Sequence, residues 1–375
     1  MFRGRLISGL SLALVIAMLS APFCGATVRT VGAEDAAPVY NLYFGDLHSH
    51  TSYSDGEGTP DEAFEAARAA GADFMAITDH HYLLLEWEWN DILRSADEHD
   101  IEGEFVAMAG YEYFIPGINE INIYGTRNMP PDAVSKPYPH FEGERMTGDS
   151  LFPWIYDWIA DEPGAIGQWN HPLSYGCPVC WDYYQFDFCN EERDLAMGMI
   201  ECYNWGDRES SYIKALDAGW HMMPTATSDD HYGEWISGYE VRTVLLAQSL
   251  TREDLYDAMR QGRGYATQDS NLEICFTLNG AVMGSVLNGE SSFTADIHIE
   301  DPDRVASDAI TWVEIVSDGG QVVKNMTGDG SCIFDSTVTL DSDGSTYYYI
   351  RVSTQSNELG LPGVTAWTAP VWTGA

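Results

Sequence analysis

Short apolar segments that each end in a metal-binding type of side chain place the strongest constraint on how this chain folds. At least six such segments occur in the first two-thirds of the 375 residues. The first leads into His48 and His50, with Asp55 five residues further on. Residues two apart on an extended segment point to the same face, so both imidazoles can reach one cation. One His-x-His pair is a weak signal, but its repetition at other segment ends indicates a shared pocket.

The spacing of these segments predicts parallel strands joined by helices. Thr59 and Glu62 form the pattern of a capping box, which indicates that a helix begins there. The apolar residues 74–77 follow the helix and run directly into His80. A strand–helix–strand unit of this length implies a parallel pair, and functional residues of such folds lie at the carboxyl ends of the strands. We therefore expect an α/β barrel of alternating strands and helices over residues 40–269.

The last third of the chain has a different pattern. Short alternating segments are separated by Asn-Gly, Gly-Gly and Asp-Gly pairs, which are typical of β-hairpins. Residues 270–375 are therefore predicted to form a small antiparallel β-sandwich.

The N-terminus has the pattern of an export signal. Residues 1–26 combine two early arginines, an apolar core and a small-residue exit, and residues 27–39 are expected to be a short lead-in. We expect a secreted or extracytoplasmic protein, with an uncleaved anchor as one alternative and a lipidated Cys24 as another. The apolar core is short for a membrane span.

The net charge of −40, from 18 basic and 58 acidic residues, disfavours partners that require basic surfaces. Duplex nucleic acid and anionic membranes are such partners, so we expect neither. A well-solvated surface suited to salty water explains the acidity better than cation buffering does.

Six cysteines remain after the predicted signal. An even number in an exported chain favours disulfides, with a structural zinc site as the alternative for the clustered four. The clustered residues are Cys177, Cys180, Cys189 and Cys202.

The side chains at the segment ends are those of a metal site that holds more than one ion. Imidazole and carboxylate together suit manganese, iron or zinc, and one ion takes only four to six ligands, so two or three divalent ions are expected. Such ions acidify a shared water and stabilise an in-line displacement, which phosphoester hydrolysis needs most. The predicted ligands are His48, His50, Asp55, His80, Glu112, His171, Asp229 and His231. The predicted catalytic residues are also among the ligands, namely Asp229, His231 and His171. Three further residues would either bind metal or hold a ligand in position, namely Glu201, His81 and Asn204.

The order of these motifs resembles the PHP (polymerase and histidinol phosphatase) superfamily from Tyr43 to about Tyr265. The resemblance rests on Gly-Asp-Leu-His48-Ser-His50, Thr-Asp-His80, Glu112, Asn-His171-Pro, Glu201-x-x-Asn204 and Ser-Asp229-x-His231. The export signal, the β-rich tail and Asp55 in place of a histidine look most like the secreted CehA/McbA-type branch.

The resemblance implies a distorted (β/α)7 barrel and a metal-dependent phosphoesterase acting on a small-molecule phosphoester. It also implies that His48, His50, Glu112 and Asp229 surround one ion, and that Asp55, His80, Glu112 and His171 surround a second. His231 would contact a third ion or the phosphate. Residues 190–200 lack the further histidine of the trinuclear members, which leaves the third ion and the role of Glu201 open.

Three functions fit the sequence. The first is a secreted metal-dependent phosphoesterase that uses a metal-bridging hydroxide as nucleophile. The second is a carbamate, amide or ester hydrolase on the same metal site. The third is a non-enzymatic surface protein that binds metal or carbohydrate.

Overall fold

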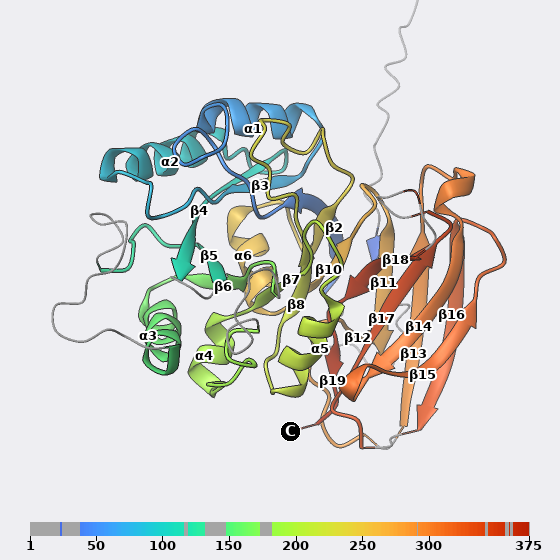
Figure 1. Cartoon of the computed structure of the whole chain (residues 1–375). Coiled ribbons are helices and arrows are strands. Elements are labelled where there is room, and N and C mark those ends of the chain that lie inside the picture. The colour runs from blue at the N-terminus through green and yellow to red at the C-terminus, as the bar shows by residue number, and fades with distance from the viewer. Residues whose placement is uncertain are drawn as a thin grey trace, which may run out of the picture.

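Helices and strands alternate in the first two-thirds of the chain, and strands predominate in the last third (Figure 1). A computed structural model describes residues 23–24, 38–115, 119–131, 148–172, 182–290, 292–341, 344–356, 360 and 363–374. The mixed α/β character predicted from the sequence is confirmed.

The described residues of the alternating part form six helices. They are α1 (Pro60–Ala69), α2 (Glu86–His99), α3 (Gly148–Asp161), α4 (Glu191–Ala196), α5 (Glu209–Asp217) and α6 (Arg252–Arg260). Its main strands are β2 (Tyr40–Asp46), β3 (Phe74–Ile77), β4 (Val106–Ile115), β5 (Asn119–Tyr124), β6 (Ile166–Trp169), β7 (Met199–Tyr203), β8 (Met223–Ala226), β9 (Arg242–Ala247) and β10 (Gly264–Thr267), and the short β1 (Phe23–Cys24) pairs with β2.

These strands belong to one sheet in the order β10-β9-β2-β3-β4-β5-β6-β7-β8. The pairs β2–β3, β3–β4, β6–β7 and β7–β8 are parallel, whereas β5 and β9 run antiparallel to their neighbours. Because β10 is antiparallel to β9, it runs in the same direction as β2. Seven of these strands therefore share one direction, namely β2, β3, β4, β6, β7, β8 and β10. The sheet also curls back on itself, because the Thr243 hydroxyl in β9 lies 2.9 Å from the carbonyl and 3.2 Å from the amide nitrogen of Ala226 in β8.

Local chemistry explains the first strand–helix–strand unit. Thr59 caps α1, and its side chain accepts a hydrogen bond from the Glu62 amide while the Glu62 carboxylate bonds back, so the predicted capping box is confirmed. All four residues of β3 are buried, as expected of a strand covered on both faces. Gly45 allows β2 to approach β3, because a Cβ atom there would lie 2.2 Å from the Phe74 carbonyl oxygen.

The last third extends the same sheet and adds a second one. From β10 the large sheet continues through β18, β17, β14 and β15, all antiparallel, and β12-β11-β13-β16 form a separate four-stranded sheet. Phe293 of β13 contacts Tyr348 of β17 with ring centroids 5.6 Å apart, so the small sheet packs on the extension. The strands are β11 (Glu273–Leu278), β12 (Ala281–Val282), β13 (Ser292–Glu300), β14 (Ile310–Ser317), β15 (Gln321–Thr327), β16 (Ile333–Asp341), β17 (Tyr347–Thr354), β18 (Gly363–Thr368) and β19 (Val371–Trp372), with short 3-10 helices η1 (Ala306–Asp308) and η2 (Asp318–Gly320).

Disulfides were predicted for the cysteines, and for three of them the prediction is wrong. Cys189, Cys202 and Cys332 are free thiols, and Cys202 is fully buried in the apolar core. Cys177 and Cys180 lie outside the described residues. Among the helices that the structure describes, none is long and apolar enough to cross a membrane.

Candidate metal centre

Five of the parallel strands deliver the predicted ligands to one edge of the sheet. His48 and His50 follow β2, His80 follows β3, His171 follows β6, and Asp229 and His231 follow β8, while Glu112 lies within β4. Two backbone bridges join the segments there: the His50 amide donates to the Asp230 carbonyl over 2.9 Å, and His80 pairs with Glu112. Carboxyl ends of parallel strands meet at one edge, so residues far apart in sequence become neighbours.

Glu112 lies at the centre of the cluster and is almost completely buried. Its carboxylate oxygens lie 3.3 Å from His48 Nε2, 3.6 Å from His50 Nε2, 2.8 Å from His80 Nδ1 and 3.3 Å from His171 Nε2. Two atoms that each lie about 2.1 Å from one cation are roughly 3.0–3.4 Å apart at ordinary ligand angles. His80 Nδ1 makes no hydrogen bond within the described residues despite its position beside the carboxylate. These spacings fit ligands that share cations.

The first group of candidate ligands consists of His48, His50 and Asp229. Asp229 Oδ1 lies 3.2 Å from His48 Nε2 and 3.1 Å from His50 Nε2, and the two imidazole nitrogens are 3.2 Å apart. Glu201 Oε1 accepts a hydrogen bond from His48 Nδ1 over 2.7 Å, which leaves the Nε2 lone pair directed at the group. Glu201 therefore orients a ligand, and Asn204 Nδ2 supports Glu201 by donating to it over 2.9 Å.

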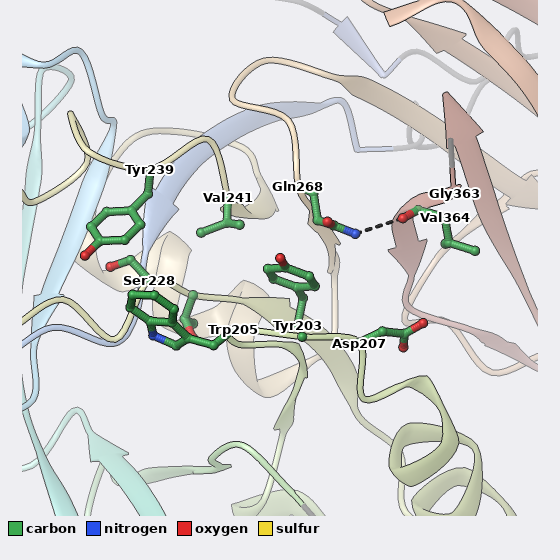
Figure 2. Close-up of a pocket in the computed structure, with 11 residues that line it drawn as sticks. Tyr203, Trp205, Asp207, Ser228, Tyr239, Val241, Gln268, Gly363 and Val364 are labelled. Carbon is green, nitrogen blue, oxygen red and sulfur yellow. Dashed lines mark hydrogen bonds between the residues drawn. The ribbon is translucent and has the colours of Figure 1, made fainter. Parts of the chain in front are cut away.

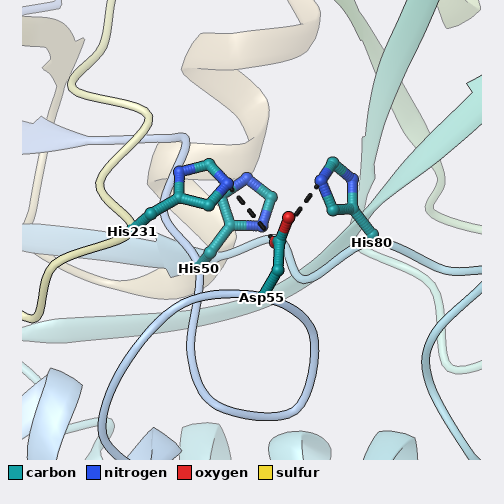
Figure 3. Close-up of side chains that lie close together, drawn as sticks. All are labelled: His50, Asp55, His80 and His231. Atoms are coloured by element: carbon teal, nitrogen blue, oxygen red, sulfur yellow. Dashed lines mark ion pairs between the residues drawn. The ribbon is translucent and has the colours of Figure 1, made fainter.

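The second group consists of His50, Asp55, His80 and His231, whose ligand atoms lie within 4.8 Å of one another (Figure 3). Asp55 Oδ1 lies 3.5 Å from His80 Nε2 and 3.4 Å from His231 Nε2. His231 Nδ1 lies 2.8 Å from the Asp229 carbonyl oxygen, which can only accept, so Nδ1 carries the proton and Nε2 faces the group. The resemblance implied Asp55 together with His171, but the structure places Asp55 with His231.

A third group includes Glu120, which sequence reasoning missed. Its carboxylate lies 3.5 Å from His80 Nδ1 and 3.4 Å from His171 Nε2, beside Glu112. Alternation along β5 places Glu120 on the same face as Asn122, and that pattern was the available signal.

The charges of the cluster favour the binding of cations. Five carboxylates contact the histidines, namely Asp55, Glu112, Glu120, Glu201 and Asp229, so up to five negative charges converge. Two divalent ions carry four positive charges and three carry six. Against the effect of burial, the Asp229, Glu112 and Glu201 carboxylates raise the pKa of His48 well above its usual value. Burial, and then the Glu112 carboxylate, raise the pKa of Glu120 to about 7.

Two of the candidate residues have a strained backbone. His171 and Asp229 have φ angles of 26° and 51°, in a region that non-glycine residues rarely adopt. Each such residue costs of order 1–3 kcal/mol and persists only where its surroundings fix it. The His171 amide donates to Glu201 Oε2 over 2.5 Å, and the Asp229 amide donates to the His48 carbonyl over 3.0 Å. Other cluster members therefore hold both residues in place.

His81 lies in the wall of the site. Its Nδ1 accepts a hydrogen bond from the Phe114 amide over 3.0 Å, and its ring stacks on Tyr113 at 4.3 Å. Burial lowers the pKa of His81 to about 4, so the ring is neutral.

A cavity of about 470 Å³ borders the loop that carries Asp229 and His231 (Figure 2). Ser228, which lines it, directly precedes Asp229, and the Tyr239 hydroxyl donates to Asp230 Oδ1 over 2.9 Å. Three aromatic rings, those of Tyr203, Trp205 and Tyr239, line one part, and β18 contributes Gly363 and Val364. The cavity therefore lies between the alternating part and the extension of its sheet.

Comparison with known proteins supports the superfamily suggested by the motifs. Residues 46–124, which are 79 of the 375, match the family model for the PHP domain. This segment contains His48, His50, His80 and Glu112. The match and the His/Asp/Glu clusters together fit a metal-dependent hydrolase.

Similarities to individual proteins are distant. An uncharacterised protein of Chlamydia pneumoniae is 22% identical over 386 aligned positions, which cover 90% of this chain, and the chain spans 58% of that protein's length. A two-domain protein from Bacteroides vulgatus, described as containing a predicted PHP-like metal-dependent phosphoesterase, is 17% identical with a TM-score of 0.44, covering 91% of this chain and 100% of that one. An amidohydrolase from Chromobacterium violaceum with bound sulfate and no metal is 15% identical with a TM-score of 0.33, covering 50% and 87%.

Proposed function

We propose that this protein is a metal-dependent phosphoesterase whose substrate is a small-molecule phosphoester. The observation that carries the proposal is the position of Glu112, whose carboxylate approaches four imidazoles from three other strand ends. Divalent manganese, iron or zinc ions held there would supply an activated water and neutralise charge on the phosphoryl oxygens. Phosphoester hydrolysis uses both contributions, because negative charge builds on several oxygens at once.

The residues of the chain have distinct tasks in this proposal. His48, His50 and Asp229 would hold one cation, and Asp55, His80 and His231 a second, with Glu112 between them. Glu120 and His171 would complete a third position. Glu201 keeps His48 in the tautomer that presents Nε2. His231 is less buried than the other histidines of the cluster and would reach a leaving-group oxygen or the phosphate.

We further propose the finer features that the PHP resemblance implies. The curled strands β2 to β9 would correspond to the distorted (β/α)7 barrel, and residues 270–375 to a β-sandwich domain. The protein would be exported by residues 1–26, would belong to the CehA/McbA-like branch, and would require no nucleic-acid duplex or membrane as partner.

The cavity beside the Asp229 loop would receive the leaving group. Its aromatic rings offer a stacking surface, which suits an aryl, sugar or base-containing group. Trp205 is largely exposed and contacts Tyr239 at 6.2 Å, so its replacement removes stacking area without touching a predicted ligand. For Trp205→Ala we expect a KM for an aryl phosphate raised about 10-fold, since one lost contact of this kind is worth roughly 1–1.5 kcal/mol.

In that experiment kcat and metal content should remain within about 3-fold of wild type, and Trp205→Phe should recover most of the affinity. An unchanged KM for substrates with small and large leaving groups would contradict this role of the cavity.

The direct test of function is a substrate panel. The purified full chain, loaded with Mn²⁺, Fe²⁺ or Zn²⁺ in turn, is assayed on aryl phosphate monoesters and diesters and on aryl carbamates. The proposal predicts hydrolysis of a phosphate ester that falls at least about 100-fold in Asp229→Asn, as expected for loss of a metal ligand. Hydrolysis of carbamates alone would favour the alternative function, a carbamate, amide or ester hydrolase on the same metal site. Activity retained in Asp229→Asn would contradict the proposed metal centre.

A further inference from the structure

Three aspartates outside the metal centre converge where the two sheets of the last third meet the alternating part. Asp269 follows β10, Asp301 follows β13, and Asp308 lies in η1, directly before β14. One carboxylate oxygen from each residue lies within 4.8 Å of the others. The three loops therefore bring negative groups from both sheets into one small volume.

Asp301 carries the strongest indication that a ligand belongs there. Its side chain is fully buried, and its Oδ1 accepts a hydrogen bond from the Asp303 amide over 3.0 Å. Its Oδ2 is also buried and has no hydrogen-bond partner among the residues that the structure describes. Buried carboxylate oxygens are almost always satisfied by a donor or a metal ion, because an unsatisfied one is strongly unfavourable.

Positive side chains do not compensate the three carboxylates. Within the described ranges, none of the three forms an ion pair with Lys, Arg or His, and the nearby Arg304 pairs with Glu300 instead. Burial, and then the Asp269 and Asp308 carboxylates, raise the pKa of Asp301 to about 7. Burial and the Asp308 carboxylate also raise the pKa of Asp269.

We propose that Asp269, Asp301 and Asp308 form a calcium-binding site that fastens the four-stranded sheet to the large sheet. The donors are oxygens only, which suits a hard cation and excludes the softer ligands that zinc and iron prefer. The ligands come from three separate loops, and Ca²⁺ accepts such irregular sets because it takes six to eight oxygens in flexible geometry. Mg²⁺ requires near-octahedral geometry and keeps several waters, so it fits less well.

The site has a structural task. Asp269 follows β10, the strand through which β18 joins the alternating part, and Asp301 follows β13, one of the two central strands of the small sheet. A cation between them would add to the side-chain packing and hydrogen bonds that already join these elements. This role is independent of the hydrolytic function proposed above, because none of the three aspartates belongs to the metal centre.

The test compares the thermal unfolding of three variants of the full chain at pH 8, with the metal centre saturated with Mn²⁺ beforehand. CaCl₂ at about 1 mM should raise the unfolding midpoint of the wild type by at least about 2 °C, as expected for a site of the affinity found in extracellular modules. Asp301→Asn should lose this shift, and without calcium it should be at least as stable as the wild type, since a repelling charge is removed. Asp303→Asn is the matched control, because it removes an exposed charge two residues away, and it should keep the shift.

A second variant and a direct count complete the experiment. Asp308→Asn, at a partly exposed position, should also lose the shift, and calorimetric titration with CaCl₂ should find one site in the wild type and none in either cluster variant. The absence of a calcium shift in the wild type, or an equal shift in both cluster variants, would overturn the site. An equal shift with MgCl₂ at the same concentration would overturn the assignment to calcium.

Discussion

A single buried side chain, that of Glu201, would orient a ligand of the proposed metal centre without itself binding metal. It bonds His48 Nδ1 over 2.7 Å and also accepts hydrogen bonds from Thr227, Asn204 and the His171 amide. Such orienting carboxylates typically contribute 10- to 100-fold in metal affinity. Sequence reasoning found Glu201 but could not assign its role, because the partner His48 is 153 residues away.

For Glu201→Gln we expect metal affinity to fall by about 10- to 100-fold, since the amide holds the imidazole less firmly in the required tautomer. Activity should recover at high metal concentration, which a ligand replacement would not allow. Metal titration of the apoprotein measures the change, and the exposed Glu290→Gln serves as control. Affinity equal to that of the wild type would show that Glu201 does not orient His48.

Glu120 provides a second test at a single side chain. The structure places it against His80 and His171, and burial together with Glu112 raises the pKa of its carboxyl to about 7. Glu120→Gln should lower the number of bound divalent ions by one, or weaken one site about 10-fold or more, because a charged ligand becomes neutral. Elemental analysis after dialysis measures the stoichiometry. An unchanged stoichiometry and affinity would place Glu120 outside the metal centre.

Among the elements, the β2–β3 pair positions three of the predicted ligands, because His48, His50 and His80 follow these two strands. Gly45→Ala should destabilise the pair, since the added Cβ would lie 2.2 Å from the Phe74 carbonyl and force the strands apart. Overpacking of this kind costs about 1–3 kcal/mol. Chemical denaturation measures the loss, and Gly374→Ala, whose Cβ would meet its nearest neighbour at 3.6 Å, should have little effect. Equal stability of both variants would contradict the close approach.

The sequence predicted these elements well where the signals are local. The capping box at Thr59 and the apolar residues before His80 depend only on neighbours in the chain, and both predictions are confirmed. Long-range pairing left no such signal. The hairpin pattern after residue 270 could not reveal that β18 pairs with β10, since the two strands lie about a hundred residues apart in the chain.

For the molecule as a whole, the metal-free protein should lose stability as the pH rises. Against the effect of burial, the Glu112 carboxylate raises the pKa of His80 and of His171 to about 9. A histidine whose pKa is raised by folding stabilises the folded state at pH values below its unfolded pKa of about 6.5. This stabilisation is lost as the pH rises through the folded pKa of about 9. The unfolding midpoint of the metal-free chain should therefore fall by about 5 °C or more between pH 6.5 and pH 9.

The loaded protein should show a flatter profile, because bound cations replace the protons as partners of the carboxylates. At low pH, Asp55 makes the stability depend on pH in the opposite direction. His231 lowers the pKa of Asp55 to about 2. The stabilisation by Asp55 is therefore present above its unfolded pKa of about 3.8 and is lost as the pH falls through 2. A metal-free midpoint that rises from pH 6.5 to pH 9 would contradict the placement of the histidines among carboxylates.

The number of transition-metal ions bound per chain is the most direct measure of the central claim. The full chain is loaded with Mn²⁺ or Zn²⁺ in the presence of saturating Ca²⁺, dialysed, and analysed for metal and protein. We expect at least two ions per chain in the wild type, a loss of at least one in His48→Ala, and no loss in His298→Ala, whose imidazole lies on β13. One ion or none in the wild type, or an equal content in both variants, would contradict a shared multi-ion centre.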